Sequence, residues 1–412
     1  MDFNDTPEEA VFRTEVRTFL DSNAERKSAT SSAFRTGHVD AEFLKTARRW
    51  QAKKAEAGYA AITWPVRYGG RGGTPIQQVI YGQEEQNYVV PHGVFHLGLN
   101  IALPTMMMFA TTEQNERHIK PALRGDEIWC QLFSEPVAGS DLAGIRTRAV
   151  REGDEWVVNG HKIWTSGAHY SDFAILIARS DPTVPKHKGL SFFFLDMKSK
   201  GVEAQPIKQM WGASRFNEVF LKDVRIPDAQ RLGAVGEGWK VALATLSHER
   251  FGVGTGIFTG PDFFDIYKLA RSLELDGRPA IENSTVREKL ADWYVRERGL
   301  KNTIFRSLTA LSRGAAPGPE AIIAKAVSPA QAQEMAAFAL DMMGMAGSLM
   351  DEDLAVSEGW FGEEYLAAPG SRLAGGSDEI VRNVIAERAL GLPPDVRVDK
   401  DLPYNQLPVG KR

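Results

Sequence analysis

Cysteine, long apolar runs and an excess of basic charge are all missing from this sequence. A single cysteine, Cys130, occurs in 412 residues, which excludes an internal disulfide framework and a cysteine-rich metal site. No segment reaches the roughly 18 consecutive apolar residues of a membrane span, so no membrane attachment is predicted. The formal net charge of −4 gives the protein no general affinity for nucleic acid.

The first residues also lack the features of a secretion signal. The opening "MDFNDTPEEAVFRTEV" carries acidic residues where a signal peptide carries basic ones, and no long apolar core follows. Thr6 and Glu9 have the spacing of a capping box, and Pro7 suits the first helical position, so a helix is predicted to begin here. We therefore expect a cytoplasmic protein.

The spacing of apolar residues changes twice along the chain. Residues 1–125 show the three- and four-residue spacing of amphipathic helices. Residues 126–235 hold short β-branched or aromatic segments between turn residues, which favours a compact antiparallel sheet or barrel. Helical spacing returns over residues 236–392, and the proline-rich polar tail 393–412 is expected to be an extended arm. The predicted fold is multidomain α+β, with a β domain between two helical domains.

Within the β zone, individual strands and one turn can be predicted. The segments "DFAILIARS", "GLSFFFLDM" and "NEVFLKDVRIP" are typical of strands. Asn159-Gly160, inside "EWVVNGHKIWTSG", is a strong signal for a two-residue hairpin turn. A hairpin turning at this dipeptide is therefore predicted.

One glycine- and serine-rich segment follows a predicted strand in "WCQLFSEPVAGSDLAG", residues 129–144. Its hydroxyls, Ser134 and Ser140, and its small residues allow backbone N–H groups to approach a ligand closely. Read from the residues alone, a tight surface turn is the favoured interpretation and a ligand-binding loop is the alternative.

A second candidate is "KIWTSGAHY", which places Trp164 beside Thr165 and Ser166 at the end of a strand. A lone tryptophan is more often a core residue. An aromatic plane flanked by two hydroxyls also suits a flat heteroaromatic ring with polar edges, so both interpretations stay open from the residues alone.

The order "SEPVAGSD", "NGHKIWTSG" and "RLAGGSDEI" resembles the acyl-CoA dehydrogenase family of flavoenzymes over about residues 5–393. The resemblance implies an N-terminal α-helical domain, a middle antiparallel β-barrel domain that binds flavin and a C-terminal four-helix-bundle domain. It also implies bound FAD and oxidation of an acyl-CoA thioester to the 2,3-enoyl-CoA. A carboxylate removes the pro-R α-proton while a hydride leaves the β-carbon for flavin N5.

The same resemblance implies a set of cofactor contacts in two separate domains. The residues carried over as cofactor-binding are Gln131, Phe133, Ser134, Ser140, Trp164, Thr165, Ser166, Ser377 and Glu379. Trp164 would cover one flavin face and Ser166 would hydrogen-bond near N5, while Ser140 would also contact the substrate thioester and pantetheine. Hydrogen bonds to the thioester carbonyl are needed because enolate charge develops there.

The general base is implied at an alternative position. Many family members place a glutamate where this chain has Gly375, and glycine cannot accept a proton. Other members place it on a helix before an arginine, which matches Glu249 and Arg250 in "SHER". Glu249 is therefore predicted as the base, with Arg250 and Gly375 at the substrate. The alternative is a Glu-Arg pair on a solvated helix face, although the surrounding "LATL" and "FGVGTG" offer little polar face.

Two elements expected from the family are missing. No "RxxFG" sequence occurs in residues 269–293, and "DMMGMAG" places Asp341 where a glutamine would meet the cofactor. An acid near a pyrophosphate is repulsive. Either Arg271 or Arg278 binds the pyrophosphate in a homo-oligomer, a dimer or tetramer, or a homologous partner subunit supplies the missing donors in a hetero-oligomer.

Several alternatives complete the predictions. Electron-transferring flavoprotein is the expected acceptor; an acyl-CoA oxidase, a flavin monooxygenase or a non-catalytic partner subunit are the rivals. His92 and His96 lie four apart, a metal-compatible spacing, but no third ligand accompanies them. A core or cavity-lining role is favoured for them and no metal is predicted. Lys186 lies in a basic loop tip, which favours a solvated loop, with contact to CoA phosphates as the alternative.

Overall fold

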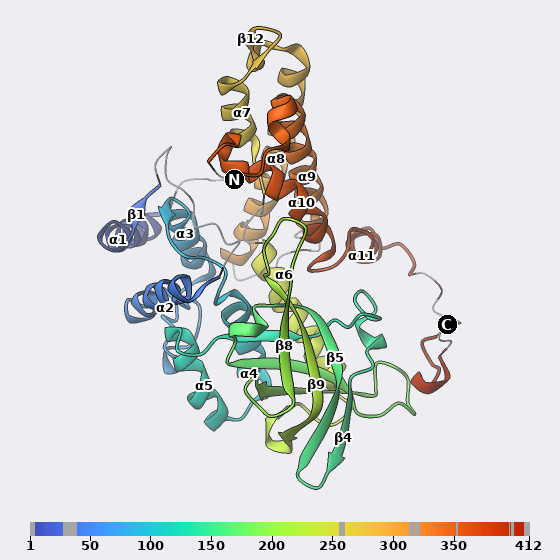
Figure 1. Ribbon diagram of the computed structural model, residues 1–412. Coiled ribbons are helices and arrows are strands. Elements are labelled where there is room, and N and C mark those ends of the chain that lie inside the picture. The colour runs from blue at the N-terminus through green and yellow to red at the C-terminus, as the bar shows by residue number, and fades with distance from the viewer. Residues whose placement is uncertain are drawn as a thin grey trace. The chain divides into compact units, whose positions relative to one another are not determined.

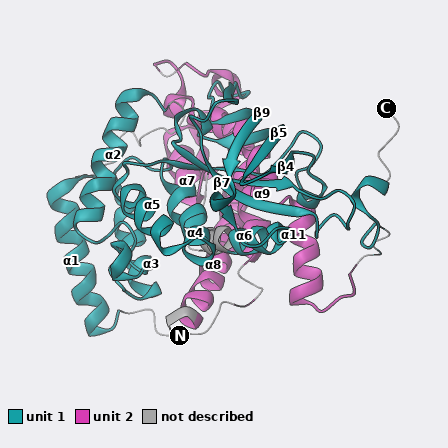
Figure 2. Cartoon of the chain, turned by 90° about the horizontal axis from the view of Figure 1, so that it is seen from below, with its two compact units in different colours: residues 1–249, 396–412 teal, residues 250–395 magenta. Residues whose placement is uncertain are grey.

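The chain divides into two units, which are described one at a time (Figure 2). Unit 1 holds residues 1–249 and 396–412, and unit 2 holds residues 250–395. The computed structural model describes the backbone of the following residues: 5–27, 39–254, 260–312, 318, 322–351, 353–394, 396 and 399–407. The side chains of residues 248–254 and 311–312 lie outside that description.

Unit 1 begins with a helical domain, as predicted. Its elements are α1 (Pro7–Asn23), β1 (Glu25–Arg26), α2 (Ala41–Glu56), α3 (Pro75–Glu85), β2 (Tyr88–Val89), α4 (Leu103–Phe109) and α5 (Thr112–Arg124). The predicted start of α1 is confirmed: Thr6 Oγ1 accepts the N–H of Glu9 at 3.2 Å, and Glu9 Oε2 accepts the N–H of Thr6 at 2.7 Å. This reciprocal pair satisfies two N–H groups that a helix end leaves unpaired.

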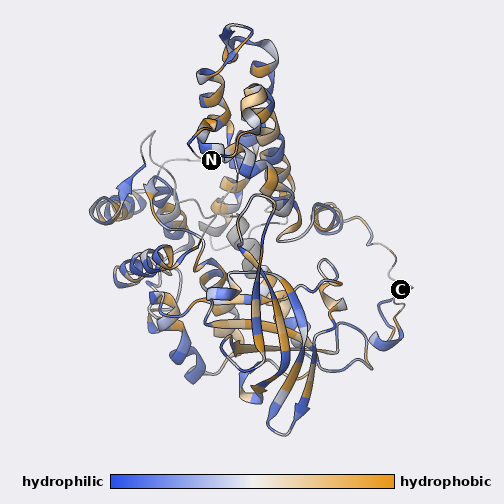
Figure 3. Ribbon diagram, in the orientation of Figure 1, coloured by the Kyte–Doolittle hydropathy of each residue, from blue (hydrophilic) through white to orange (hydrophobic). Residues whose placement is uncertain are grey.

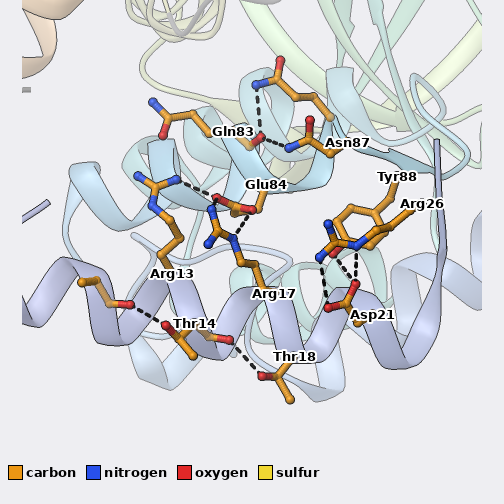
Figure 4. Close-up of polar contacts among 12 residues, drawn as sticks. Arg13, Thr14, Arg17, Thr18, Asp21, Arg26, Gln83, Glu84, Asn87 and Tyr88 are labelled. Atoms are coloured by element: carbon orange, nitrogen blue, oxygen red, sulfur yellow. Dashed lines mark hydrogen bonds and ion pairs between the residues drawn. The ribbon is translucent and has the colours of Figure 1, made fainter. Parts of the chain in front are cut away.

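A carboxylate between two arginines connects α1 to α3 (Figure 4). Glu84 is buried, and its two oxygens accept hydrogen bonds from Arg13 Nη1 at 2.8 Å and Arg17 Nε at 2.8 Å. Burial raises the pKa of Glu84, but the two guanidinium groups outweigh burial and hold the pKa below its usual value. The charge is therefore compensated where it is removed from water.

The middle of unit 1 is an eight-stranded sheet (Figure 1). Its strands are β3 (Trp129–Leu132), β4 (Arg148–Glu152), β5 (Glu155–Ser166), β6 (Phe173–Arg179), β7 (Leu190–Asp196), β8 (Val202–Ile207), β9 (Phe216–Pro227) and β10 (Arg231–Leu232). The order is β10-β7-β6-β4-β5-β9-β8, with β3 also paired to β6. Among the described strands this order has two free ends, so the prediction of a closed barrel was wrong.

The predicted antiparallel pairing holds for most strand pairs of this sheet, and the exceptions are β3 and β4, which run parallel to β6. Leu132 pairs with Leu176, and Arg148 pairs with Arg179 farther along the same strand. Strands β3 and β4 therefore follow one another on one side of β6. The loop between them, residues 133–147, leaves this line and returns to it.

The predicted hairpin at Asn159-Gly160 was wrong as well. Both residues lie inside β5, where the pairing with β9 shifts by a bulge, and the chain turns earlier, at Gly153. Gly160 is required by contact: an added Cβ would lie 2.2 Å from Thr147 Oγ1. Asn159 exchanges two hydrogen bonds of 3.0 Å with Asp223, a residue at φ 50° on β9. The dipeptide therefore serves a bulge.

Strands β6 and β7 are buried on both faces, which explains their almost wholly hydrophobic sequences, whereas β8 and β9 carry hydrophilic residues as well (Figure 3). Alternate residues of β7 point to opposite faces. Phe192 packs in a cluster with Met106 of α4 and Ile119 of α5. Phe193 packs in a second cluster with Trp156 of β5. Helices therefore cover one face of the sheet. On the other face, side chains from different strands of the same sheet pack against each other, although the described edge strands β10 and β8 do not pair.

Unit 2 is helical, as predicted for the C-terminal domain. Its elements are α7 (Phe263–Ser272), β11 (Glu274–Leu275), β12 (Arg278–Pro279), α8 (Ser284–Ser312), α9 (Ile323–Met343), α10 (Trp360–Leu373) and α11 (Asp378–Val384). Helices α7 to α10 share one apolar cluster that includes Leu269, Trp293, Met335 and Phe361. Helix α6 (Gly238–Gly254) crosses the boundary between the two units. Among the described helices, none is long and apolar enough to span a membrane.

Candidate functional site

The two motifs singled out in the middle domain lie against each other. The N–H of Ile163 donates to the carbonyl oxygen of Ser134 at 2.9 Å, which joins the segment after β3 to β5. Next to this bond, Lys162 Nζ donates to the carbonyl oxygen of Phe133 at 2.9 Å. The segments "SEPVAGSD" and "NGHKIWTSG" are therefore joined through the main chain and one lysine.

A buried ion pair closes the loop formed by residues 133–147. Lys162 is fully buried, and its Nζ lies 2.9 Å from Glu135 Oε1. The same carboxylate accepts the N–H groups of Arg146 at 2.6 Å and Thr147 at 2.9 Å, at the far end of the loop. Burial raises the pKa of Glu135, but Lys162 and these donors outweigh burial and lower it. Sequence reasoning missed this pair, although a lysine between apolar strand residues is a signal for one.

Trp164 is held in a backbone conformation that a bulky residue rarely adopts. Its φ is 59°, and it lies in the second register shift of the β5–β9 pairing, between Lys162 and Thr165. Trp164 as a residue is 56% exposed, and its ring meets Phe216 edge to face, with centroids 5.9 Å apart. Such a conformation costs about 1–3 kcal/mol and is concentrated at functional sites. The strained bulge presents an indole plane outside the core.

The two hydroxyl residues after Trp164 point to different environments. Thr165 is buried, and its Oγ1 has no hydrogen-bond partner among the described residues. Its carbonyl accepts Asn217 Nδ2 at 2.9 Å, and Asn217 also contacts His169. Ser166 is half-buried and lines a cavity. Of the two hydroxyls, the one of Ser166 is therefore placed to meet a ligand, while that of Thr165 is covered by protein and lies outside the cavity lining.

The cavity beside Ser166 has a volume of about 210 Å³. Its lining comes from the segment before α4, from β3 and from the region after β5: Gly93, Val94, His96, Leu97, Trp129, Ser166, Tyr170 and Ser171. His96 thus lines a cavity, as favoured by the sequence, whereas His92, for which the same role was favoured, is exposed and is not among the lining residues. Among the described residues, no group of three or more His, Cys, Asp or Glu could hold a metal ion.

The remaining predicted residues of the middle domain occupy three environments. Gln131 on β3 and Ser134 after it are half-buried, and Ser140 is exposed in the loop. Phe133 is different, because its ring is in the core, edge to face with Phe192 at 5.7 Å. The Phe133 side chain cannot lie along an exposed ring without leaving the core, so only its main chain is available for such a contact.

Two predictions about the surface of this domain were wrong. Lys186 is not in a solvated loop tip, because it is buried and its Nζ lies 3.0 Å from Asp141 and 2.6 Å from Asp399. The C-terminal arm does not stay free of the fold, because Tyr404 N donates to the carbonyl of Val184 at 2.9 Å. Both were missed because their partners are distant in sequence.

The predicted residues of unit 2 lie around the start of α11. Ser377 caps this helix and accepts the N–H of Ile380 at 3.4 Å, while Glu379 is exposed. Gly375 and Gly376 precede the cap at φ 65° and 105°. These values favour glycine, so a glutamate at position 375 would be strained.

The predicted base and its neighbour cannot be placed by their side chains. Glu249 and Arg250 belong to α6, but their side chains lie outside the described residues. The three residues connected with pyrophosphate binding are exposed on unit 2: Arg271 at the end of α7, Arg278 on β12 and Asp341 on α9.

The middle-domain residues fit the ring of a flavin. The indole of Trp164 offers an exposed plane, and the half-buried Ser166 offers a polar group at its edge, whereas the Thr165 side chain is covered by protein. The loop also leaves room at Gly139, where an added Cβ would meet no atom within 4 Å. The main chain around Ser134 and the Ser140 hydroxyl are the further groups that would hold a ligand in the loop.

Comparison with known families matches nearly the whole chain. Residues 6–126 match the model "Acyl-CoA dehydrogenase, N-terminal domain", residues 130–224 the middle domain of that family, and residues 236–390 its C-terminal domain. The matched segments coincide with the helical domain, the sheet and the second helical domain.

Individual relatives give the same result. Acyl-CoA dehydrogenase IpdE1 of Mycobacterium tuberculosis is 34% identical over 391 residues, covering 94% of this chain and 98% of that protein. Acyl-CoA dehydrogenase FadE34 of the same organism is 35% identical over 83% of this chain, which spans 46% of FadE34, about half its length. The structure described as Tcur3481-Tcur3483 steroid ACAD is 26% identical, with a TM-score of 0.78 over 96% of this chain and 100% of that one.

Proposed function

The chain belongs to the acyl-CoA dehydrogenase family, and we propose that it oxidises an acyl-CoA thioester to the 2,3-enoyl-CoA with FAD, Glu249 being the general base. The enzyme is an oxidoreductase of a FAD-binding family. The observation that carries the flavin assignment is Trp164, whose indole is held out of the core at a costly φ of 59° beside two hydroxyls. A conformation of this cost persists where function requires it.

The middle domain supplies the ring contacts in this proposal. Trp164 would cover one face of the flavin, Ser166, beside Thr165, would hydrogen-bond at its polar edge, and Gln131 and Ser134 would line the ring with the main chain of Phe133. Bound FAD supplies the hydride acceptor. The cavity that Ser166 lines has apolar residues, among them Val94, Leu97 and Trp129, beside polar ones, and its apolar part could hold part of the acyl group.

The loop and the helices supply the substrate contacts. Ser140 hydrogen-bonds toward the thioester, where negative charge develops as the α-proton leaves. Glu249 takes that proton, Arg250 lies beside it, and the missing side chain at Gly375 leaves room for the carboxylate. Ser377 and Glu379 contact the cofactor from the C-terminal domain. A general base works best when its pKa lies near the working pH, and burial can raise the pKa of a glutamate toward neutrality.

We further propose a homo-oligomer, a dimer or tetramer, that passes electrons to electron-transferring flavoprotein. A hetero-oligomer is the second candidate, and a specific observation favours it: Asp341 is exposed where the family expects a glutamine, and the "RxxFG" sequence is absent. The name of the related steroid ACAD joins two proteins. In this second candidate, the protein works with a homologous partner subunit and its substrate carries a bulky, ring-bearing acyl group.

Flavin content decides between these assemblies. The measurement is FAD per chain after this protein is purified alone. About one FAD per chain supports a self-sufficient homo-oligomer. A folded protein with little or no flavin, which gains it on co-expression with a homologous chain, supports the hetero-oligomer.

The base is tested by Glu249→Gln with Glu288→Gln as the matched control, because Glu288 is an exposed glutamate of α8. Anaerobic flavin bleaching by an acyl-CoA that the wild type oxidises is followed. We expect bleaching by Glu249→Gln to be slowed at least about a thousandfold with FAD retained, since no other group replaces the base, and the control to match the wild type. Undiminished bleaching by Glu249→Gln contradicts the assignment. Steady formation of hydrogen peroxide with oxygen as the sole electron acceptor would instead indicate an acyl-CoA oxidase.

A further inference from the structure

The C-terminal arm, Asp399–Leu407, packs on the loop that carries Ser140. It contains a short 3₁₀ helix, Tyr404–Gln406. Main-chain bonds fix its course: Tyr404 N donates to the Val184 carbonyl at 2.9 Å, and Asn405 N donates to the Pro182 carbonyl at 3.0 Å. The arm therefore has a defined register on the segment between β6 and β7.

The first contact between arm and loop passes through a buried arginine. The Tyr404 ring lies over the guanidinium of Arg179, whose Cζ is 3.6 Å from the ring centroid. Arg179 is 3% exposed and donates to the carbonyl oxygens of Ala143 at 2.5 Å and Ile145 at 3.3 Å. Tyr404 also reaches the loop directly, because its hydroxyl donates to the Gly144 carbonyl at 3.1 Å. Three consecutive loop carbonyls are thus held by Arg179 and Tyr404 together.

The second contact is a lysine shared between two carboxylates. Lys186 Nζ lies 3.0 Å from Asp141 Oδ2 on the loop and 2.6 Å from Asp399 Oδ2 on the arm. The Lys186 carbonyl in turn accepts Arg179 Nη1 at 3.0 Å. Asp141 is the residue directly after Ser140, so this lysine fixes the loop next to the hydroxyl proposed to meet the thioester.

We propose that the arm is a positioning element for substrate: Tyr404 and Asp399 hold residues 141–145 through Arg179 and Lys186, and so place Ser140. The inference rests on the proposed function of Ser140. The far end of the loop is held separately by Glu135, at Arg146 and Thr147. The arm therefore controls the tip of the loop and leaves its base unchanged.

The variants isolate each part of this contact. Tyr404→Ala removes both the ring and the hydroxyl, whereas Tyr404→Phe keeps the ring over Arg179 and loses the bond to Gly144. Asp399→Asn weakens the hold on Lys186. Asn405→Ala is the matched control, since its side chain is exposed and its arm contact uses only the main chain.

Two measurements are made on the FAD-loaded enzyme. Hydrogen exchange of the loop amides reports positioning without reference to activity, and steady-state kinetics separates KM from kcat. For Tyr404→Ala we expect faster exchange in residues 141–145, unchanged exchange in β3 and a KM about tenfold higher, the factor that about 1.4 kcal/mol represents. The kcat falls as well, because a displaced Ser140 loses its hydrogen bond to the thioester, where negative charge develops in the transition state. Tyr404→Phe recovers most of the KM, and Asn405→Ala matches the wild type.

Three outcomes overturn the proposal. Loop exchange that Tyr404→Ala leaves unchanged shows that the arm does not hold the loop. Faster exchange with an unchanged KM shows that the loop it holds does not position substrate. A lower KM shows that the arm covers the site. If the wild type oxidises no acyl-CoA, the proposed function fails, while the exchange measurement still decides whether the arm holds the loop.

Discussion

Two buried glutamates, one in each half of unit 1, show how the same ion-pair chemistry serves different ends. Glu84 lies between two arginines, and the Arg17 side chain is 52% exposed, so the network opens to water. Glu135 faces Lys162, and their side chains are 4% and 0% exposed. The oxygens of Glu84 accept hydrogen bonds from side chains of another helix, whereas Glu135 also accepts two main-chain N–H groups. Glu84 and its two arginines join helices α1 and α3, whereas the Glu135–Lys162 pair holds a loop in shape.

The largest expected effect comes from breaking the second pair. Glu135→Gln leaves the Lys162 ammonium buried without an opposite charge, so the free energy of unfolding falls by about 3–5 kcal/mol. FAD content falls as well, because the N–H groups of Arg146 and Thr147 lose the ionised carboxylate that fixes the end of the loop. Urea unfolding and flavin absorbance measure both quantities.

The control for this change is Glu152→Gln on the same sheet, whose carboxylate is 54% exposed beside Arg225. It should change the free energy of unfolding by less than about 0.5 kcal/mol, as expected for an exposed pair. An equal loss in both variants would show that burial of the Glu135–Lys162 pair has no special weight.

A smaller effect is expected from the first pair. Glu84→Gln should lower the free energy of unfolding by about 1–2 kcal/mol, because bonds to charged groups are lost but solvent screens the exposed arginine. FAD content should stay that of the wild type. If Glu84→Gln removes flavin as Glu135→Gln does, the distinction between the two glutamates fails.

The pH dependence sharpens the same comparison. The folded pKa of Glu84 lies below its ordinary value of 4.5. Its contribution is therefore complete above about pH 4.5 and is lost as the pH falls through the folded pKa. The stability difference between wild type and Glu84→Gln, measured by urea unfolding from pH 7 to pH 3, should shrink below about pH 4.5. A constant difference would mean that charge is not its source.

The smallest effect on stability is expected at Trp164. In Trp164→Gly, relief of the backbone strain at φ 59° raises the free energy of unfolding by about 1 kcal/mol. Loss of the ring contact with Phe216 lowers it by about the same amount. The free energy of unfolding of the flavin-free protein should stay within about 1 kcal/mol of wild type, while the FAD dissociation constant rises at least about tenfold. Trp164→Phe, which keeps an aromatic plane, should retain most of the FAD affinity. Unchanged FAD affinity in Trp164→Gly would remove the strongest support for the flavin assignment.

The order of domains could be predicted because it depends on local spacing. The capping box at Thr6 and the strands around Phe192 are local patterns, and the structure confirms them. The hairpin at Asn159-Gly160 failed because the same dipeptide also satisfies a bulge, and only the partner strand decides between the two uses.

The rest of the site depends on contacts that local patterns do not encode. Tyr404 and Gly144 are 260 positions apart, and no local sequence pattern near either residue predicts their contact. Lys186 looked solvated because both of its carboxylates come from other segments. The strain at Trp164 is a property of the β5–β9 register, and residue spacing within one strand does not reveal it.

The arrangement of β3 and β4 along one side of β6 has a consequence for protein engineering. The chain leaves that line after Leu132 and rejoins it at Arg148, and the register on β6 is set by the two strands alone. Glu135 and Lys162 close the base of the excursion. Between these ends the loop is not freely replaceable, because Leu142, Ala143 and Ile145 are part of the core on the helix-covered face of the sheet. A redesigned loop has to keep these buried residues, whereas the exposed positions 136, 137, 139 and 140 can be varied while the sheet stays the same.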